Sequence, residues 1–335
     1  MKLIFHVGMG KTGSSAIQAA LAANAERLAA QKAEYLGMWF DMIDPRFHGL
    51  KNQDLFFTQS QSEMETTAET LVAVLKARSA DRGIETFILS NEALSGRAHV
   101  LKPMIDKLMA EDINVQVVGY ARNPAAWLPS AHIQWSVRDK VEAGPIKPYG
   151  ARARKLVGWY SGLISWGKVF GNIVDIRPYD RAADIVADFS EAIGTKLDTS
   201  GARVLERGED AEVLLRALFN NRFNDHTLPQ VFDRTVLRTT ATIPRMEELA
   251  RKCFDYSETD KILAENAQLF DRFTSQFGFD PRNEGDTRLA MPDMPTLRNR
   301  VFDCLVEIVL NQAQRIQRLE RRITSLEASS RATSD

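Results

Sequence analysis

Residues 3–15 read LIFHVGMGKTGSS, an apolar run followed at once by glycines, one lysine and three hydroxyl side chains. The apolar run has the length and the Ile, Phe and Val content that are typical of a strand buried in a parallel sheet. Later runs of the same kind are 85–90, 114–120 and 172–177. Stretches with helical spacing lie between these runs, at 14–31, 62–79, 99–110 and 124–138. This alternation predicts a doubly wound, mainly parallel α/β sheet.

The chain beyond residue 180 has a different pattern, which is helical. The helices predicted there are 181–193, 209–223, 258–276 and a long final run from about 297. We therefore expect an α/β domain over residues 1–295 and a C-terminal helix over 296–335, a possible coiled coil with a frayed end. Two irregular stretches, 35–61 and 139–151, have the length of lids or substrate walls; alternatively, their aromatic side chains simply cover the sheet.

The composition is that of an ordinary globular protein of 335 residues, with 44% hydrophobic and 26% charged residues. Lysine and arginine number 43 against 44 aspartate and glutamate, a net charge of −1, so nucleic acid is not an expected partner. Cys253 and Cys304 belong to no CxxC or Cys/His cluster, which argues against a disulfide framework or a zinc site and favours a cytoplasmic location. The N-terminal run is short and broken by His6, so it predicts a strand rather than a signal peptide, and no later run predicts a membrane span.

The segment after the first strand has the composition of a phosphate-binding loop. Glycines let the backbone wrap around an anion, helix N-terminal amides point at it, and a lysine and hydroxyls add charge and donors. The residues expected to bind phosphate here are Gly10, Lys11, Thr12, Gly13, Ser14 and Ser15. A tight glycine-rich turn without any ligand is the alternative, and the lysine and hydroxyls at this spacing make it the weaker one.

The loop does not have the spacing of a Walker A motif. The pattern GxxxxGK[ST] would require its first glycine at position 5, where this chain has Phe5. The later strands also lack a terminal aspartate that could hold magnesium, because they run into Ser90-Asn91-Glu92 and into Tyr120-Ala121-Arg122. Magnesium-dependent triphosphate chemistry therefore lacks its usual residues.

Residues 6–18, HVGMGKTGSSAIQ, resemble the 5′-phosphosulfate loop of sulfotransferases that use 3′-phosphoadenosine 5′-phosphosulfate (PAPS). The usual form of that loop is close to HxGxxKTGTTxxQ. This chain differs in having Ser14 and Ser15 where two threonines are commoner, a change that keeps both hydroxyls. The resemblance implies a fold of the P-loop/sulfotransferase type, with PAPS as the sulfate donor and no metal.

The resemblance also implies a site for the 3′-phosphate of the nucleotide. In the family, an arginine at the end of a later strand and a serine eight positions on grip this phosphate, and here Arg122 and Ser130 have that separation. Asn123 can cap a helix that has Pro124 at its first position, and the first two turns would carry Ser130 to the same end as Arg122.

Sulfuryl transfer to an alcohol needs a base that takes the proton of the attacking hydroxyl. Glu92 follows the strand at 85–90, and sulfotransferases that act on glycans or proteins are similar in placing a glutamate near such a strand end. A capping or arginine-pairing role is the alternative for Glu92. His48, in the first irregular stretch, is the second candidate for the base, because other sulfotransferases use histidine.

These residues predict a PAPS-dependent sulfotransferase with Lys11, Glu92 and His48 as catalytic candidates. The acceptor would be a hydroxyl or amine of a glycan, a lipid or a small alcohol, and the sequence does not choose among them. A nucleotide kinase with an altered Walker loop and a non-catalytic nucleotide-binding oligomeric scaffold are the two rival functions.

The C-terminal helix carries apolar residues at alternating steps of three and four. They are Phe302, Leu305, Val309, Ile316, Leu319, Ile323 and Leu326, with Gln312 as the one polar member. This spacing is a four-heptad a/d stripe, which predicts a homo-oligomer held partly by residues 302–326. Alternatively, the first half of the stripe packs on the chain's own core.

Overall fold

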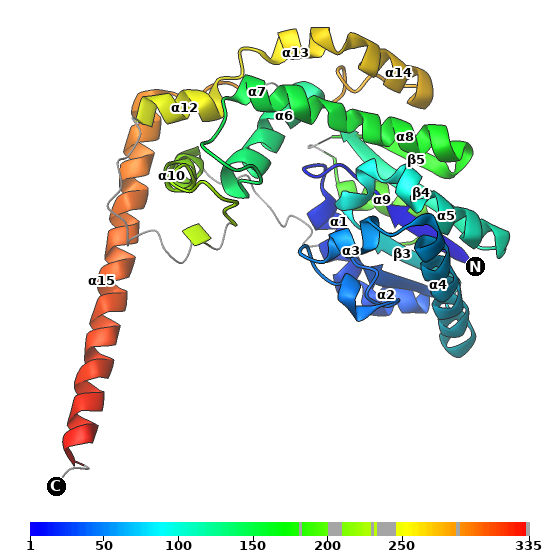
Figure 1. Cartoon of the computed structure of the whole chain (residues 1–335), viewed down its shortest axis with the longest axis horizontal. Coiled ribbons are helices and arrows are strands. Elements are labelled where there is room, and N and C mark those ends of the chain that lie inside the picture. Colours follow the sequence, from blue (N-terminus) through cyan, green and yellow to red (C-terminus); the bar gives the residue numbers. More distant parts are fainter. Residues whose placement is uncertain (181–182, 200–209, 229–230, 233–245, 286–288, 333–335) are drawn as a thin grey trace. The chain divides into compact units, whose positions relative to one another are not determined.

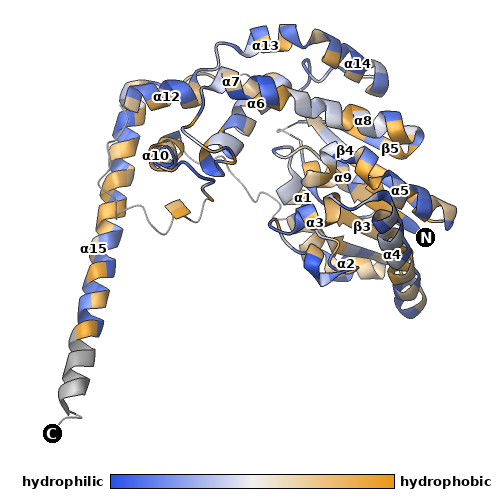
Figure 2. Ribbon diagram, viewed as in Figure 1, coloured by the Kyte–Doolittle hydropathy of each residue, from blue (hydrophilic) through white to orange (hydrophobic). Residues whose placement is uncertain are grey.

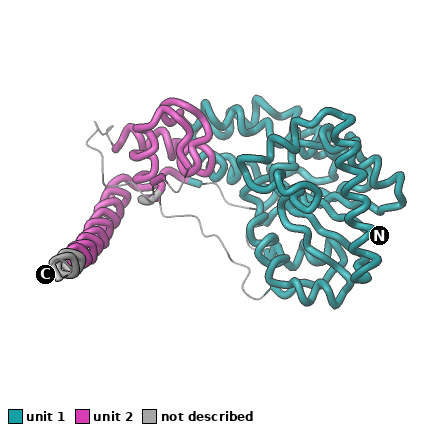
Figure 3. The backbone as a smooth tube through the Cα atoms, turned by 60° about the horizontal axis from the view of Figure 1, so that its bottom comes forward, with its two compact units in different colours: residues 1–132, 149–206, 256–289 teal, residues 133–148, 207–255, 290–335 magenta. Residues whose placement is uncertain are grey.

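The computed structural model describes residues 1–180, 183–199, 210–228, 231–232, 246–285 and 289–332, without the side chains of 211–212 and 324–332. The chain forms two compact units, which Figure 3 colours separately. The first comprises 1–132, 149–206 and 256–289, and the second comprises 133–148, 207–255 and 290–335. The domain boundary predicted near residue 295 stays a prediction.

The first unit is built on a five-stranded sheet in which all strands run parallel (Figure 1). The strands are β1 (Lys2–His6), β2 (Ala33–Gly37), β3 (Thr86–Ser90), β4 (Asn114–Arg122) and β5 (Val174–Tyr179). Their order across the sheet is β2-β3-β1-β4-β5. The predicted doubly wound parallel sheet is therefore confirmed.

The alternation of side chains along β1 explains why both faces of the sheet are covered. Leu3 and Phe5 point into one apolar cluster, and Ile4 points into a second cluster on the opposite face. The first cluster is completed by helices α4 (Gln61–Arg82), α5 (Ala98–Ala110) and α8 (Tyr160–Phe170). The second is completed by α1 (Ser14–Ala23), α2 (Ala25–Ala30) and α9 (Ile185–Ile193). A strand buried on both faces needs the continuous apolar run that opens this sequence.

The strand order places the end of β1 at the switch point of the sheet. The chain leaves β1 toward β2 on one side and leaves β4 toward β5 on the other, although β1 and β4 are neighbours. Connections that diverge in this way open a crevice at the C-terminal ends of the two strands, where α/β proteins bind ligands. The glycine-rich loop and Arg122 follow these two strands.

Strand β2 was not predicted, and the stretch 35–61 is more regular than expected. It contains the end of β2, a 3₁₀ turn at Pro45–Phe47 and helix α3 (Gln53–Phe57). Phe40, Phe56 and Phe57 are buried in the first apolar cluster, so these aromatics do cover the sheet. The sequence signal for β2 was weak because this edge strand buries only Ala33 and Leu36.

Two predicted helices are each interrupted at an asparagine. The helix expected at 14–31 breaks at Asn24, and the helix expected at 258–276 breaks at Asn266 into α13 (Thr259–Glu265) and α14 (Ala267–Phe277). Each side-chain amide bonds the carbonyl four residues earlier, Asn24 to Ala20 at 2.8 Å and Asn266 to Ile262 at 2.7 Å. These bonds compete with the backbone ladder, which explains the breaks. Helix α7 (Tyr149–Leu156) and helix α8 were not predicted.

The second unit is helical in its described part. Its elements are a π-helical segment (Ile133–Arg138), α10 (Asp210–Asn220), α12 (Met246–Phe254) and α15 (Met294–Ala332). Helix α10 packs against the other three. The buried Lys140 amine donates hydrogen bonds to the carbonyls of Phe223 and Asp225, and so connects the chain after the π-helical segment to the chain after α10. The long C-terminal helix is confirmed as α15, and helix α12 was not predicted.

Candidate functional site: the loop after the first strand

The backbone of the loop after β1 is bent by two residues with positive φ. Gly13 has φ 85° and forms the N-cap of α1, and Lys11 has φ 70°. A side chain at Gly13 would be strained, and its Cβ would also lie 2.9 Å from Ile185. The first turn of α1 carries no acidic residue. The amides at the start of this helix and the positive end of its dipole therefore face the loop with no carboxylate in their own turn.

Three polar side-chain atoms converge on Gly8. A Cβ built on Gly8 would lie 2.9 Å from His6 Nε2 and 3.3 Å from both Ser14 Oγ and Thr12 Oγ1. His6 and Ser14 are buried, and neither His6 Nε2 nor Ser14 Oγ has a hydrogen-bond partner among the described residues. Thr12 Oγ1 instead donates to the Met9 carbonyl at 2.5 Å. Buried polar atoms without partners are costly, so they mark a place where a ligand or water completes the site.

His6 is held in its neutral form by its surroundings. Burial lowers the pKa of His6 to about 3, so the imidazole carries no charge at neutral pH. Its Nδ1 lies 2.7 Å from Ser90 Oγ. When the Ser90 hydroxyl donates to Nδ1, the ring proton is on Nε2, and His6 becomes a donor that faces the loop.

The two ends of the motif meet at the end of β3. Gln18 Nε2 donates to the Ser90 carbonyl at 3.2 Å, while His6 contacts the Ser90 hydroxyl. The next residue, Asn91, donates its backbone amide to the His6 carbonyl at 3.1 Å. The motif's histidine and glutamine thus fix the strand end that precedes Glu92.

Glu92 begins a 3₁₀ turn (Glu92–Gly96) and is half-buried. Asn91 caps this turn, because its Oδ1 accepts the amide of Ala93 at 2.9 Å, and its Nδ2 donates to the Met38 carbonyl at 2.9 Å. The capping role that the sequence left open for Glu92 therefore belongs to Asn91. Asn91 is hydrogen-bonded to His6 of β1, and Glu92 directly follows Asn91. Because of this position, Glu92 stays a candidate base.

Arg122 ends β4 and contacts the loop. Its Nη1 donates to the Lys11 carbonyl at 3.3 Å, and its guanidinium lies over the ring of Tyr179, 5.5 Å from the centroid. The Arg122 carbonyl accepts a hydrogen bond from the buried hydroxyl of Tyr160. These contacts hold a cationic group beside the glycine-rich loop.

Helix α6 (Pro124–His132) starts as predicted, with Asn123 Oδ1 accepting the amide of Ala125 at 2.9 Å. The indole of Trp127 donates to the Gly10 carbonyl at 2.8 Å and so ties the helix to the loop. Ser130 is half-buried, whereas every other residue of α6 is buried. Sequence reasoning missed Trp127, although a tryptophan that is buried usually needs an acceptor for its N–H.

His48 has a different setting from the loop residues. Its side chain is 65% exposed, its Nδ1 lies 2.7 Å from Asp41 Oδ2, and its ring meets the edge of Trp39. The structure thus brings the Arg122 guanidinium to the Lys11 carbonyl and bonds Asn91, the residue before Glu92, to β1. It places His48 in an exposed pair with a carboxylate.

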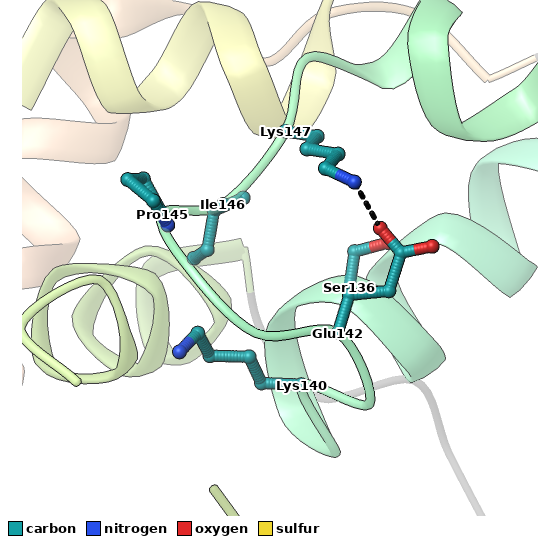
Figure 4. Close-up of a pocket in the computed structure, with 6 residues that line it drawn as sticks. All are labelled: Ser136, Lys140, Glu142, Pro145, Ile146 and Lys147. Atoms are coloured by element: carbon teal, nitrogen blue, oxygen red, sulfur yellow. Dashed lines mark ion pairs between the residues drawn. The ribbon is translucent and has the colours of Figure 1, made fainter. Parts of the chain in front are cut away.

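The second unit contains a small pocket that is separate from these residues (Figure 4). The residues lining it are Ser136, Lys140, Glu142, Pro145, Ile146 and Lys147. It has room for about one water molecule, and the ion pair between Lys147 and Glu142 at 2.8 Å lies at its side. In the described part of the chain, no three His, Cys, Asp or Glu residues are grouped to hold a metal ion. None of the described helices has the length and apolar content to cross a membrane.

No family model matches the chain, and no curated protein matches it either. Among solved structures, the chain is similar to a crystal structure of a sulfotransferase from Alicyclobacillus acidocaldarius. The sequence identity is 13% and the TM-score is 0.35, over 70% of this chain and 99% of that one. A likeness at this level decides nothing about chemistry, so a functional proposal has to rest on the residues around the loop.

Proposed function

We propose that the protein is a PAPS-dependent sulfotransferase that modifies a hydroxyl or amine group. The observation that carries the proposal is the pair of buried polar atoms, His6 Nε2 and Ser14 Oγ, which converge on Gly8 without a partner among the described residues. They lie inside the loop whose sequence resembles the 5′-phosphosulfate loop of that family. A bound phosphate oxygen would accept from both groups, so the residues present fit the cofactor.

The residues of the loop would hold the 5′-phosphate. The backbone amides of Gly13, Ser14 and Ser15 stand at the start of α1, and both serine hydroxyls can donate. The Thr12 hydroxyl gives its proton to Met9, so Thr12 would contribute its backbone amide. The Gly10 carbonyl accepts the indole N–H of Trp127, so Gly10 would contribute to the shape of the turn.

The 3′-phosphate of the nucleotide would be held by Arg122 and Ser130. The Arg122 side chain is held by the Lys11 carbonyl and the Tyr179 ring, so it loses little side-chain freedom when it binds an anion. Ser130 is the half-buried hydroxyl of α6, the helix that Trp127 ties to the loop.

PAPS, when bound, supplies a sulfuryl group that is activated by its attachment to the 5′-phosphate. The Lys11 ammonium would balance the negative charge that grows on this phosphate, a contribution that is largest in the transition state. The Glu92 carboxylate would accept the proton of the acceptor hydroxyl, and His48 with Asp41 is the second candidate for that role. Glycans, lipids and small alcohols are the proposed acceptor classes.

Nucleotide selectivity tests the proposal directly. Adenosine 3′,5′-bisphosphate should raise the melting temperature more than AMP or ATP at equal concentration, because only the bisphosphate carries the 3′-phosphate. At 100 times its Kd a ligand adds about 2.7 kcal/mol of stability, which a thermal shift measures easily. Equal shifts for all three nucleotides would contradict the cofactor assignment.

Sulfate transfer is then measured with radiolabelled PAPS and separate glycan, lipid and small-alcohol extracts. Label transferred to one extract identifies the acceptor class. Turnover of ATP with magnesium would indicate the nucleotide kinase instead. Selective binding of the bisphosphate with no transfer to any extract would indicate the non-catalytic scaffold.

A further inference from the structure

Helix α15 carries two apolar stripes with different surroundings. Leu297 and Val301 are buried within the second unit, and Cys304 and Ile308 continue that stripe as half-buried residues. The other stripe is between 43% and 66% exposed. Its apolar members with described side chains are Phe302, Leu305, Val309, Ile316, Leu319 and Ile323. Its polar member Gln312 is half-buried, and Val306 and Leu310 are exposed beside the stripe. Figure 2 shows hydrophobic positions alternating with polar ones along α15.

Among the described residues, the apolar side chains of the exposed stripe are not buried in the chain's own core, and this holds for its first half as well. Phe302 is 66% exposed and Val309 is 59% exposed, although α15 packs against α10. Leu297 and Val301 of α15 are buried, whereas the described apolar residues of the other stripe are exposed. A regularly spaced apolar stripe on an exposed helix is typical of a surface that another helix covers.

The residue types on the stripe indicate how many helices the coiled coil contains. Placing Phe302 at heptad position a puts Val309, Ile316 and Ile323 at a as well. Position d then holds Leu305, Gln312, Leu319 and Leu326, of which the side chain of Leu326 lies outside the described residues. β-branched residues at a with leucine at d favour two parallel strands, and one polar residue in the seam fixes the register.

The charged residues beside the stripe select the orientation. Arg315 is at position g and Glu320 is at the following position e. In a parallel dimer each g residue meets the next e residue of the other helix, so Arg315 meets Glu320 of a second copy. The sequence repeats this arrangement with Arg322 and Glu327, the latter outside the described side chains. An antiparallel pair would bring arginine against arginine and glutamate against glutamate.

We propose that the chain forms a homodimer through a parallel, in-register, two-stranded coiled coil of residues 302–326. The occupant of the exposed stripe is therefore a second copy of the same stripe, with Gln312 against Gln312. The length of the segment is about 37 Å at 1.5 Å per residue, which is enough for the four heptads of the seam. This inference is independent of the proposed sulfotransferase function.

The first experiment measures the mass of the full-length protein by light scattering and sedimentation. The wild type should have twice the chain mass of 37.6 kDa. The double variant Ile316→Asp/Leu319→Asp places two charges in the seam and should raise the dimer Kd at least about 100-fold. Both side chains are exposed within one chain, so the two folded units should keep a cooperative thermal transition, while α15 loses part of its helical signal without its partner.

The matched control is Gln317→Asp, which adds a charge at position b, away from the seam. It should leave the dimer Kd within about threefold of the wild type. A wild type of single-chain mass would overturn the proposal. A dimer that persists unchanged in the double variant would overturn it as well, since its interface would then lie elsewhere.

The second experiment measures orientation by cross-linking, in a Cys304→Ser background that removes the half-buried native thiol of α15. Ile323→Cys lies near the end of the seam, so a parallel dimer brings the two new thiols together and mild oxidation should yield a covalent dimer. Arg321→Cys, at position f, points away from the partner helix and should stay uncross-linked. A dimeric Ile323→Cys protein that does not cross-link, or that links no better than Arg321→Cys, would overturn the parallel pairing.

Discussion

The glycine-rich loop and the C-terminal helix differ in the kind of group that each leaves without a partner. The loop buries His6 Nε2 and Ser14 Oγ with no hydrogen-bond partner among the described residues, whereas α15 exposes apolar side chains such as Phe302. Buried polar atoms are completed by a polar ligand, and exposed apolar stripes are completed by another apolar surface. Buried polar atoms without a hydrogen-bond partner therefore indicate a polar ligand, and exposed apolar side chains in a stripe indicate a protein partner.

The largest expected effect is at the charged residue of the loop. Lys11→Ala should lower turnover about 1,000-fold, because the ammonium stabilises charge that develops in the transition state. The matched control is Lys32→Ala, since Lys32 also has positive φ but forms an exposed ion pair with Glu85. Steady-state kinetics of both variants separates charge stabilisation from backbone strain. Equal losses in the two would contradict the role of Lys11.

The next largest effect is expected at the candidate base. Glu92→Gln should lower turnover with acceptor about 100-fold and leave the affinity for adenosine 3′,5′-bisphosphate unchanged, because the carboxylate acts only on the acceptor. His48→Gln, measured in the same assay, is the comparison. A normal rate for Glu92→Gln together with a loss in His48→Gln would transfer the role of base to His48.

Arg122 should matter for binding rather than for the chemical step. Arg122→Ala should weaken binding of adenosine 3′,5′-bisphosphate about 30-fold, the size of a lost charge-assisted hydrogen-bond pair, with a much smaller effect on AMP. Calorimetric titration of both nucleotides measures the difference. A uniform loss would mean that Arg122 mainly supports the loop through its bond to the Lys11 carbonyl.

The buried histidine predicts a pH dependence of stability. The pKa of His6 is about 3 in the folded chain and about 6.5 when unfolded, so below pH 6.5 the unfolded state binds the extra proton. His6 therefore makes the free energy of unfolding fall by up to about 1.4 kcal/mol per pH unit as pH drops from 6.5 toward 3. From pH 7 to pH 5 the wild type should lose about 2 kcal/mol more than His6→Asn, measured by urea unfolding. Parallel curves for the two proteins would show that His6 is not buried in neutral form.

The sequence predicted the parts of the molecule whose signals are local. Four of the five strands, the position of the loop and the start of α6 at Asn123 all follow from neighbouring residues. The contacts that complete the site join residues far apart, such as Gln18 with Ser90, 72 positions on, and Gly10 with Trp127, 117 positions on. These depend on strand order, which periodicity does not specify. The roles of the named site residues stay predictions.

The helix break at Asn24 also depends on a contact between residues that are far apart in the sequence. Asn24 bonds the backbone of Asp198, which supports the break after α1. The residues near position 24 give no sequence signal for that contact. For α15 the a/d spacing follows from the sequence, but only the burial of Leu297 and Val301 shows which stripe is left exposed.

The smallest expected effect tests the charged residues beside the exposed stripe. Glu320→Arg would place arginine against Arg315 of the second copy in a parallel dimer, and it should raise the dimer Kd about three- to tenfold at low salt. The double reversal Arg315→Glu/Glu320→Arg restores opposite charges and should bring the Kd within about twofold of the wild type. An antiparallel dimer would respond differently, because Glu320→Arg would there exchange a glutamate pair for an arginine pair, and the Kd should stay nearly unchanged. Sedimentation at low and high salt measures these shifts, which should shrink as salt screens the charges. A Glu320→Arg protein with the Kd of the wild type, or a double variant as weak as Glu320→Arg, would therefore contradict the parallel pairing while leaving the loop, and the chemistry proposed for it, untouched.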